Sequence, residues 1–266
     1  GVDTGGTFTD CVLIDYEADG GRVSIAKVPS QPASPHEAIL GGVAALGNGG
    51  EPAESLTHGT TIATNAVITD DFARVGLITT RGFRDILEIG TQQRPLLYDL
   101  KQRPRPAMVP RQLRREVAGR VSATGDVVEP IDPDEVAEVA DWLREQGVEA
   151  IAVACLFSFV NPDHENEIRR IVEERCPGIY VGCSATASPE PREYPRFATA
   201  AVNAGLAPKI DPYIRELESR LSAGETSDRL FIMQSNGGIG TADRCVGENV
   251  HQLILSGPAA GVITDN

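Results

Sequence analysis

Residues 1–10 of the chain read GVDTGGTFTD, and this stretch decides how the chain begins to fold. An apolar stub carries Asp3, a Gly-Gly turn flanked by threonines follows, and a β-branched, apolar run covers residues 11–14. The pattern predicts a strand, a tight turn and a second strand. Glycines let such a turn adopt positive φ and approach a ligand, and its successive N–H groups form a concave anion site. An ordinary β-hairpin is the alternative, but the complete string favours phosphate binding.

The side chains around this turn suit a nucleotide and its metal. Asp3 stands where a Mg²⁺ carried in by a nucleotide needs a carboxylate or its bound water, so we expect it to bind Mg²⁺ and to serve catalysis. Five neighbours are expected to hold the nucleotide: Thr4, Gly5, Gly6, Thr7 and Thr9. The sequence contains neither a G-x-x-x-x-G-K-[ST] loop nor a strand followed by G-x-G-x-x-G, which excludes the two commonest nucleotide motifs.

Composition narrows the class of protein. The 266 residues, 41% hydrophobic and 23% charged, suffice for a globular protein with more than one domain or subdomain. A net charge of −14 argues against a nucleic-acid surface, which needs basic patches, but not against a nucleotide. The sequence shows no apolar run of 18 residues and no signal peptide, so no membrane partner is expected.

The cysteines and the first residues of the sequence carry two further expectations. Its five cysteines are scattered and form no C-x-x-C pair, which favours buried, reduced thiols and a cytoplasmic location. The chain opens inside its first expected strand without a methionine, so we expect a trimmed or incomplete N-terminus.

Strands and helices alternate along the sequence and predict an α/β fold. The glycine-bearing loops 4–7, 58–61, 235–238 and 256–261 each follow an expected strand, and ligands in such folds gather at the carboxyl ends of strands. We therefore expect these loops to converge on one crevice. The expected strands are 1–4, 9–15, 22–28, 55–57, 74–80, 149–157, 230–233 and 253–255.

The expected helices carry recognisable start and stop signals. One runs from the Ser34 cap to about residue 46, with Glu37 closing a capping box, and another ends near residue 68. Further helices are expected at 133–146, from the Asn161-Pro162 cap to 175, and at 193–221 with an interruption near Pro208 and Pro212. The Arg- and Pro-rich segment 93–116 is expected to be an extended surface connector, with an anion-facing basic cluster as the alternative.

Two loops outside the first turn are further candidates for a site. The loop at 58–61 precedes a helix whose N-terminal N–H groups suit a phosphate or a substrate carbonyl, and His58 is expected to donate a hydrogen bond or carry a proton. A helix cap with an incidental histidine is the alternative. The loop at 235–238 is either a substrate or phosphate loop or a tight left-handed turn, for which Asn-Gly is a strong signal.

Other chemistries find no support in the sequence. There is no G-x-S-x-G elbow, no cysteine in a His/Asn context and no His/Cys cluster with metal-ligand spacing. Arg196 and Asn203 lie on one polar face of the helix at 193–221, which by itself indicates a solvated surface.

The opening string resembles the first phosphate loop of the actin, hexokinase and sugar-kinase superfamily. Within that superfamily the chain is most similar to the hydantoinase/oxoprolinase family. The further segments that resemble family signatures are HGTTIATNAV at 58–67, VGLITTRGFRDILEIG at 75–90, RPLLYDL at 94–100, NPDHE at 161–165, Glu-Tyr-x-Arg…Asn-Ala at 193–204, MQSNGG at 233–238 and SGPAAGV at 256–262.

The resemblance implies a ribonuclease H-like mixed sheet flanked by helices, with a second α/β subdomain, and dependence on ATP and Mg²⁺. It implies transfer of a phosphoryl group to a carbonyl oxygen, which drives ring-opening hydrolysis of a cyclic amide such as a hydantoin or 5-oxoproline, with ketone carboxylation as the alternative. Asp3 and His58 are the implied catalytic residues. The implied substrate residues are Gly59, Thr60, Thr61, Asn65, Arg196, Asn203, Ser235, Asn236 and Gly237.

The resemblance also implies that the chain is one part of a larger subunit. The family's second phosphate segment follows soon after the Ser-Gly-Pro-Ala motif, whereas this sequence ends at Asn266 without it. We expect a phosphate-loop subdomain at 1–92, a second α/β subdomain at 93–190 and a return segment at 191–266. The missing half, or a second subunit, is the expected partner. A sugar-kinase-like enzyme and a non-catalytic assembly module are the other hypotheses.

Overall fold

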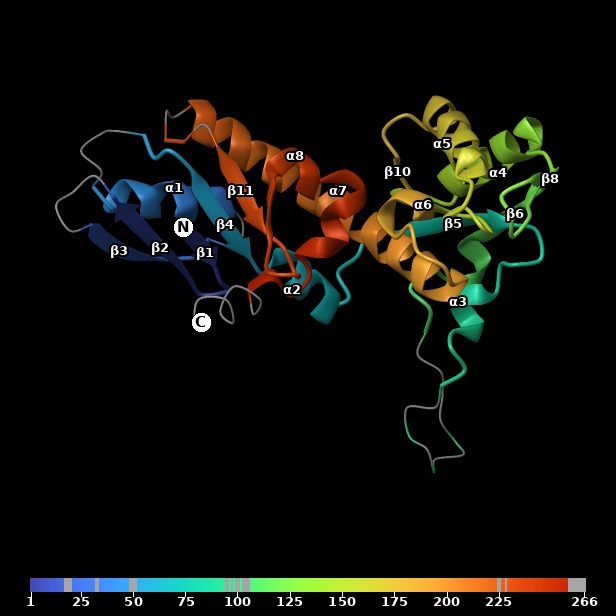
Figure 1. Ribbon diagram of the computed structural model, residues 1–266, viewed down its shortest axis with the longest axis horizontal. Coiled ribbons are helices and arrows are strands. Elements are labelled where there is room, and N and C mark those ends of the chain that lie inside the picture. Colours follow the sequence, from blue (N-terminus) through green and yellow to red (C-terminus); the bar gives the residue numbers. More distant parts are fainter. Residues whose placement is uncertain are drawn as a thin grey trace. The chain divides into compact units, whose positions relative to one another are not determined.

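The computed structural model describes residues 1–16, 21–31, 34–47, 52–93, 96, 98, 101, 106–223, 226, 227 and 229–257. Contacts divide the chain into two units. Unit 1 comprises Gly1–Asp71 and Lys209–Asn266, and unit 2 comprises Phe72–Pro208. Each unit contains its own sheet with helices packed on it (Figure 1). Helix α7 (Glu193–Ala223) contributes its first half to unit 2 and its second half to unit 1.

Unit 1 is built on a six-stranded mixed sheet in the order β12-β11-β4-β1-β2-β3. Its strands are β1 (Val2–Thr4), β2 (Phe8–Asp15), β3 (Arg22–Pro29), β4 (Leu56–Thr60), β11 (Leu230–Met233) and β12 (Ile239–Thr241). Strands β1, β4 and β11 are parallel, whereas β2 is antiparallel to both of its neighbours. The carboxyl ends of β1, β4 and β11 therefore lie at the same edge of the sheet.

Helices cover one face of this sheet beside β1 and β2. Helix α1 (Pro35–Ala45) contacts β2 and β3, and Gly42 leaves no room for a side chain against Cys11 of β2. Cys11 pairs with Val2, so both point to this covered face. The remaining elements of unit 1 are α2 (Ile62–Ile68), α8 (Ala242–Cys245) and the 3₁₀-helix η2 (Gly247–Leu253).

Unit 2 is built on a four-stranded parallel sheet in the order β10-β9-β5-β6. Its strands are β5 (Val75–Thr80), β6 (Arg114–Val117), β9 (Ala150–Ala154) and β10 (Tyr180–Cys183). Every residue of β5 and β9 is buried, as is typical of parallel strands that are covered on both faces. Strands β7 (Arg120–Val121) and β8 (Val127–Glu129) form a separate hairpin.

The helices of unit 2 begin where the sequence supplies caps. The Asp132 side chain accepts the N–H of Asp134 at 3.0 Å, and Pro133 occupies the first turn of α4 (Pro133–Glu145). Helix α5 (Asp163–Arg175) contacts α4 and β10. The other elements are α3 (Ile86–Ile89), η1 (Arg111–Leu113), α6 (Ser184–Ala187) and the first half of α7.

The fold class expected from the sequence is confirmed: a mixed sheet is flanked by helices, and a second α/β unit accompanies it. Seven of the eight expected strands are present, with ends that differ by a few residues. The expected strand at 253–255 is wrong, because Gly247–Leu253 forms the 3₁₀-helix η2. The Ser34 side chain makes no cap hydrogen bond to α1, so the expected capping box does not form. Glu37 instead pairs with Arg220 at 2.8 Å.

Two predictions about longer segments are wrong. Helix α7 runs through Pro208 and Pro212 without a break, because residues around both prolines, among them Leu206, Ile210 and Ile214, are buried and hold the helix in place. The end of the expected connector 93–116 is not an extended surface segment. It contains η1 and the sheet strand β6, whose Arg114 is buried, while residues 94, 95, 97, 99, 100 and 102–105 lie outside the described part.

The division into units also runs elsewhere than the expected boundaries near residues 92 and 190. Strand β5 pairs with β9 in one sheet, so the chain enters unit 2 at Phe72. It returns to unit 1 at Lys209, inside α7.

Candidate functional site

The parallel strands of unit 1 bring three of the four candidate loops to one sheet edge. The turn at 5–7 follows β1, Thr61 follows β4, and the loop at 234–238 follows β11. The fourth segment joins them at its start, because the Ser256 hydroxyl donates to the Thr60 carbonyl at 3.0 Å. The rest of that segment, from residue 258, lies outside the described residues.

A short hairpin turn connects β1 to β2. Gly5 N–H donates to the Phe8 carbonyl at 3.0 Å, and the Ser30 hydroxyl donates to the Gly5 carbonyl at 2.8 Å. Neither Gly5 nor Gly6 has the positive φ expected of them. The N–H groups of Gly6 and Thr7 donate to no other group in the described part of the chain, and both residues are exposed. The turn thus has two exposed residues whose N–H donors are available to a ligand.

Two threonines beside the turn are buried. Thr9 is fully buried, and its hydroxyl lies 3.0 Å from that of Ser30, so it supports the turn from behind. The hydroxyl of Thr4 is buried without a hydrogen-bond partner among the described residues. The Thr4 carbonyl accepts the Thr61 hydroxyl at 3.3 Å, which ties the end of β1 to the start of α2.

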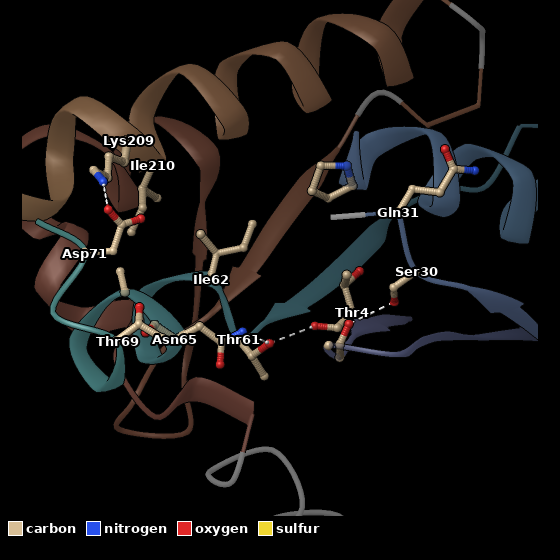
Figure 2. A pocket seen from close by; sticks show the side chains of 14 residues that line it. Thr4, Ser30, Gln31, Thr61, Ile62, Asn65, Thr69, Asp71, Lys209 and Ile210 are labelled. Carbon is tan, nitrogen blue, oxygen red and sulfur yellow. Dashed lines mark hydrogen bonds and ion pairs between the residues drawn. The ribbon is translucent and has the colours of Figure 1, made fainter. Parts of the chain in front are cut away.

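A pocket of about 380 Å³ opens beside this turn (Figure 2). It extends from the hairpin turn along α2 to an ion pair between Asp71 and Lys209, which point toward each other in Figure 2. Its wall is polar at the turn and more apolar along α2. The lining residues are Thr4, Gly5, Gly6, Ser30, Gln31, Pro35, Thr61, Ile62, Asn65, Ala66, Thr69, Asp71, Lys209 and Ile210.

Asp3 lies at the same edge but on the other face of the sheet. Neighbouring residues of a strand point to opposite faces, so Asp3 is exposed where Val2 and Thr4 are buried. It stands between Asp10 of β2 and Gly59 of β4, and a Cβ on Gly59 would lie 2.9 Å from its Oδ1. Desolvation, and then the charge of Asp10, raise the pKa of Asp3.

His58 lies within strand β4 rather than in a loop. Its side chain is fully buried, and Nε2 lies 2.7 Å from the Tyr213 hydroxyl of α7. Burial lowers the pKa of His58 to about 4, with the backbone of Val2 opposing the shift. The imidazole is therefore neutral at physiological pH and does not line the pocket. Gly59 and Thr60 belong to the same strand, and Thr61 is the N-cap of α2.

The loop after β11 adopts the tight turn that was one of its two interpretations. Gly237 has a φ of 81°, its N–H donates to the Gln234 carbonyl, and the Asn236 side chain accepts the Gly238 N–H at 2.8 Å. The N–H of Ser235 donates to the Gln252 carbonyl at 2.7 Å. Ser235, Asn236 and Gly237 do not line the pocket.

Arg196 and Asn203 belong to unit 2, and the expectation that they form a solvated face is wrong. Both are buried, and Asn203 donates to the Tyr180 hydroxyl at 3.0 Å. Arg196 donates to the Cys155 carbonyl at 2.8 Å and to the hydroxyls of Ser158 and Ser184. These hydrogen bonds tie the Arg196 guanidinium to other residues of unit 2.

The carboxylate of Glu165 is buried beside this guanidinium, with Oε1 of Glu165 3.5 Å from Nη1 of Arg196. The same carboxylate accepts the N–H groups of Cys155 at 2.7 Å and Ala185 at 2.8 Å. The group therefore ties the segment after β9 to α5 and α6.

Sequence reasoning missed one whole side of the pocket. Ser30, Gln31 and Pro35 follow β3, which runs antiparallel to β2, so its carboxyl end returns to the same edge. Lys209 and Asp71 come from segments 138 residues apart. The sequence carried a signal for the first group, because the hairpin 9–28 was predicted, but none for the second.

No three His, Cys, Asp or Glu side chains gather to hold a metal ion in the ranges given above. None of the helices described for this chain is long and apolar enough to cross a membrane.

Comparison with known proteins gives matches over the whole chain. The model of the hydantoinase/oxoprolinase N-terminal region matches residues 1–176, and the hydantoinase/oxoprolinase model matches residues 196–265. The caprolactamase subunit alpha of Pseudomonas jessenii is 35% identical over 98% of the chain. The 5-oxoprolinase 1 of Arabidopsis thaliana is 29% identical, also over 98%.

Two solved structures share the fold. A nucleotide-free acetone carboxylase superposes with a TM-score of 0.88 at 26% identity over 100% of this chain. The ATP-dependent caprolactamase from Pseudomonas jessenii superposes with a TM-score of 0.81 at 33% identity over 98%. The chain spans 39% and 38% of these two proteins, 38% of the caprolactamase subunit alpha and 23% of the 5-oxoprolinase.

Proposed function

The chain belongs to the hydantoinase/oxoprolinase family, and we propose that it forms the N-terminal part of an ATP-dependent enzyme subunit that opens a cyclic amide. In this proposal unit 1 supplies one wall of the nucleotide site. The observation that carries the proposal is the single sheet edge on which the β1–β2 turn, Thr61 and the loop after β11 meet.

The hairpin turn is the proposed phosphate contact. The N–H groups of Gly6 and Thr7 have no acceptor in the described part of the chain, and two adjacent N–H donors suit a phosphate oxygen. Ser30 and Thr9 hold the turn in place from behind. Thr61 and Asn65 line the adjoining pocket, which we assign to the substrate or to the transferred group.

The residues on the other face fit a magnesium ion. Mg²⁺ is bound in proteins through one or two carboxylates together with waters and phosphate oxygens. Asp3 and Asp10 are paired across β1 and β2, and the charge of Asp10 raises the cost of ionising Asp3, a cost that a cation relieves. Asp3 would hold the ion, which when bound would neutralise the phosphate charge. Lys27, 2.9 Å from Asp10, already balances the second carboxylate.

His58 has a supporting role in this proposal. Its burial and its bond to Tyr213 fix β4 against α7, and with it the Asp3–Gly59 neighbourhood. A bound nucleotide would supply the phosphoryl group that activates the carbonyl oxygen, and positioned donors rather than a covalent nucleophile would stabilise the charge that develops.

Hydrolysis of a cyclic amide is our first choice, and carboxylation of a ketone is the second. The caprolactamase is 33% identical to the chain in the structural comparison and the acetone carboxylase 26%, which favours the amide. The partner in this proposal is the remainder of the subunit or a second subunit. The caprolactamase relative, which is a subunit alpha, supports this. The five cysteines are buried and form no disulfide with one another, which supports a reducing, cytoplasmic setting.

Calorimetry with MgATP tests the proposal on this chain and on the longer subunit. We expect the longer subunit to bind MgATP, this chain to bind it weakly, and Asp3→Ala to weaken binding by about tenfold or more, as the loss of a charge-assisted contact does. Asp243→Ala, an acidic residue on α8, is the matched control and should bind as the wild type does. Equal affinity of the Asp3→Ala and wild-type subunits would overturn the phosphate-loop assignment.

Substrate turnover then separates the two chemistries. An ATP-dependent rise in ring-opened product from a lactam or hydantoin supports hydrolysis. ATP-dependent fixation of bicarbonate onto a ketone, with no lactam opening, would instead select carboxylation.

A further inference from the structure

A second pocket, in unit 2, is lined mainly by arginines. It has a volume of about 330 Å³ and lies where η1, the edge strand β6, α4 and the turn after β5 meet. Its lining consists of Arg84, Arg111, Gln112, Arg114, Arg115 and Trp142, with no carboxylate among the described residues. The sequence alone had left a basic, anion-facing cluster as the alternative for this segment.

The acidic residues nearby hold two of the guanidinium groups. Asp85 accepts from Arg111 Nε and Nη2 at 2.8 and 2.9 Å, and Glu88 lies 3.0 Å from Arg114 Nη2. The third carboxylate, that of Glu116, accepts the backbone N–H groups of Gly82 and Arg84. These pairs orient the arginines and leave their remaining N–H groups for another acceptor.

Arg84 and Arg115 are the two arginines of the pocket that are not paired with a carboxylate among the described residues. Neither forms a salt bridge in the described part of the chain, and the Nε of each is buried without a hydrogen-bond partner there. The Arg115 guanidinium stacks on Trp142, 3.4 Å from the ring centroid, which fixes its plane. Four guanidiniums against three carboxylates, those of Asp85, Glu88 and Glu116, leave an excess of positive charge in the wall.

Arg114 provides the buried anchor of the pocket. Its side chain is almost completely buried, its Nε donates to the Val109 carbonyl at 2.8 Å, and Nη2 binds Glu88. Its Nη1 is buried and has no hydrogen-bond acceptor among the residues described, since the nearest carboxylate oxygen, on Asp85, is 3.9 Å away. A buried N–H without an acceptor is costly, and an oxyanion supplies the acceptor.

We propose that this pocket binds a small, multiply charged oxyanion, such as a diphosphate or a dicarboxylate, at a site separate from the proposed nucleotide site of unit 1. Planar guanidiniums recognise both groups through paired N–H donors, so the chemistry is shared. The volume exceeds that of a single phosphate group and suits a ligand with two charged ends.

Trp142 makes the test specific, because it is the only tryptophan in the chain and it lies in the pocket wall. The protein is titrated in phosphate-free buffer, without magnesium, with pyrophosphate and separately with succinate, while tryptophan emission and binding heat are recorded. We expect one-to-one saturation of both signals for at least one anion, with an affinity that falls as sodium chloride is raised. The anion that saturates identifies the class of ligand.

Two variants probe the wall. Arg115→Ala removes an unpaired cation, and Gln112→Glu adds a carboxylate at an exposed position that supports no other contact in the described structure. We expect each to lower the affinity measured by calorimetry by about tenfold or more, the effect of losing one charge-assisted contact. Circular dichroism confirms that both are folded.

Two controls keep the result interpretable. Arg170→Ala removes an exposed arginine elsewhere in unit 2, and Lys209→Ala removes the cation of the other pocket. Both should bind the anion as the wild type does. Saturation lost in Lys209→Ala but kept in Arg115→Ala and Gln112→Glu would place the anion in unit 1 and overturn the proposal. No change in Trp142 emission and no binding heat with either anion would overturn it as well.

Discussion

The two units differ in the kind of polar group that they bury. In the described part of unit 1 the buried polar side chains are hydroxyls and the neutral imidazole of His58. Unit 2 buries charged groups, namely Arg114, Glu165 and Arg196. Unit 1 therefore keeps its carboxylates and ammonium groups near the surface, where a ligand can reach them, whereas unit 2 uses charge to hold its own loops together.

The two units therefore differ in the groups with which they can bind an anion. The hairpin turn of unit 1 offers backbone N–H groups, which need no desolvated charge and leave room for a metal ion beside Asp3. The arginine pocket of unit 2 offers guanidiniums that are held by carboxylates behind them. The hairpin turn therefore suits an anion that is bound together with a metal ion. The arginine pocket suits an anion that carries no metal ion.

Removal of Arg196 should give the largest effect on stability. Arg196→Ala leaves Glu165 buried without its cation and the Cys155 carbonyl without its donor, so the free energy of unfolding should fall by about 3–5 kcal/mol. Urea unfolding followed by Trp142 emission measures this, because Trp142 reports on unit 2 alone.

Arg170→Ala is the matched control for that experiment. Arg170 is half exposed and pairs with Glu167 and Glu174 on the surface of α5, so its loss should cost less than about 1 kcal/mol. Equal losses in the two variants would contradict the claim that unit 2 depends on its buried charges.

The second effect concerns pH and unit 1. The folded pKa of His58 is about 4 and its ordinary value 6.5, so the unfolded chain takes up a proton that the folded chain refuses. The stabilisation is complete above pH 6.5 and is lost as pH falls toward 4, by about 3 kcal/mol in total. Hydrogen exchange of the β4 amides between pH 7.5 and 4.5 should show this loss in the wild type.

His58→Gln removes the titrating group at the same position and serves as the comparison. We expect it to be less stable at pH 7.5 but to lose about 3 kcal/mol less than the wild type on acidification. The same pH dependence in both proteins would show that His58 does not titrate as a buried neutral group.

His58 and Arg196 also show which features of the structure could not be predicted from the sequence. Turn chemistry and hydrophobic period located seven of the eight expected strands and placed Gly5 and Gly6 in the hairpin, because those signals are local. The burial of His58 depends on Tyr213, 155 residues away, and that of Arg196 on Glu165, 31 residues away. No local pattern reports whether a polar side chain has such a partner, so both were placed at or near a surface.

The third effect tests how Asp3 is positioned. An added Cβ in Gly59→Ala would lie 2.9 Å from Asp3 Oδ1, and the carboxylate, as the movable end of a side chain, must shift. We expect a stability loss of about 1 kcal/mol together with weaker MgATP binding by the longer subunit. Gly41→Ala in α1 meets nothing within 4 Å and should leave binding unchanged. Unaltered MgATP affinity in Gly59→Ala would mean that the position of Asp3 is not critical.

The smallest effect on stability should come from the ion pair at the far end of the unit 1 pocket. The side chains of Lys209 and Asp71 are 34% and 67% exposed, so water and salt screen their attraction. Lys209→Met keeps the length of the side chain and removes the charge, and it should change the free energy of unfolding by less than about 1 kcal/mol, with the difference fading in 0.5 M salt. Urea unfolding at two salt concentrations, followed by circular dichroism, measures it. A loss as large as that of Arg196→Ala would mean that unit 1 also depends on charge for its stability, and the contrast between the two units would fail. A small loss leaves Lys209 available as a charge for ligands, which is the role that its place in the pocket wall supports.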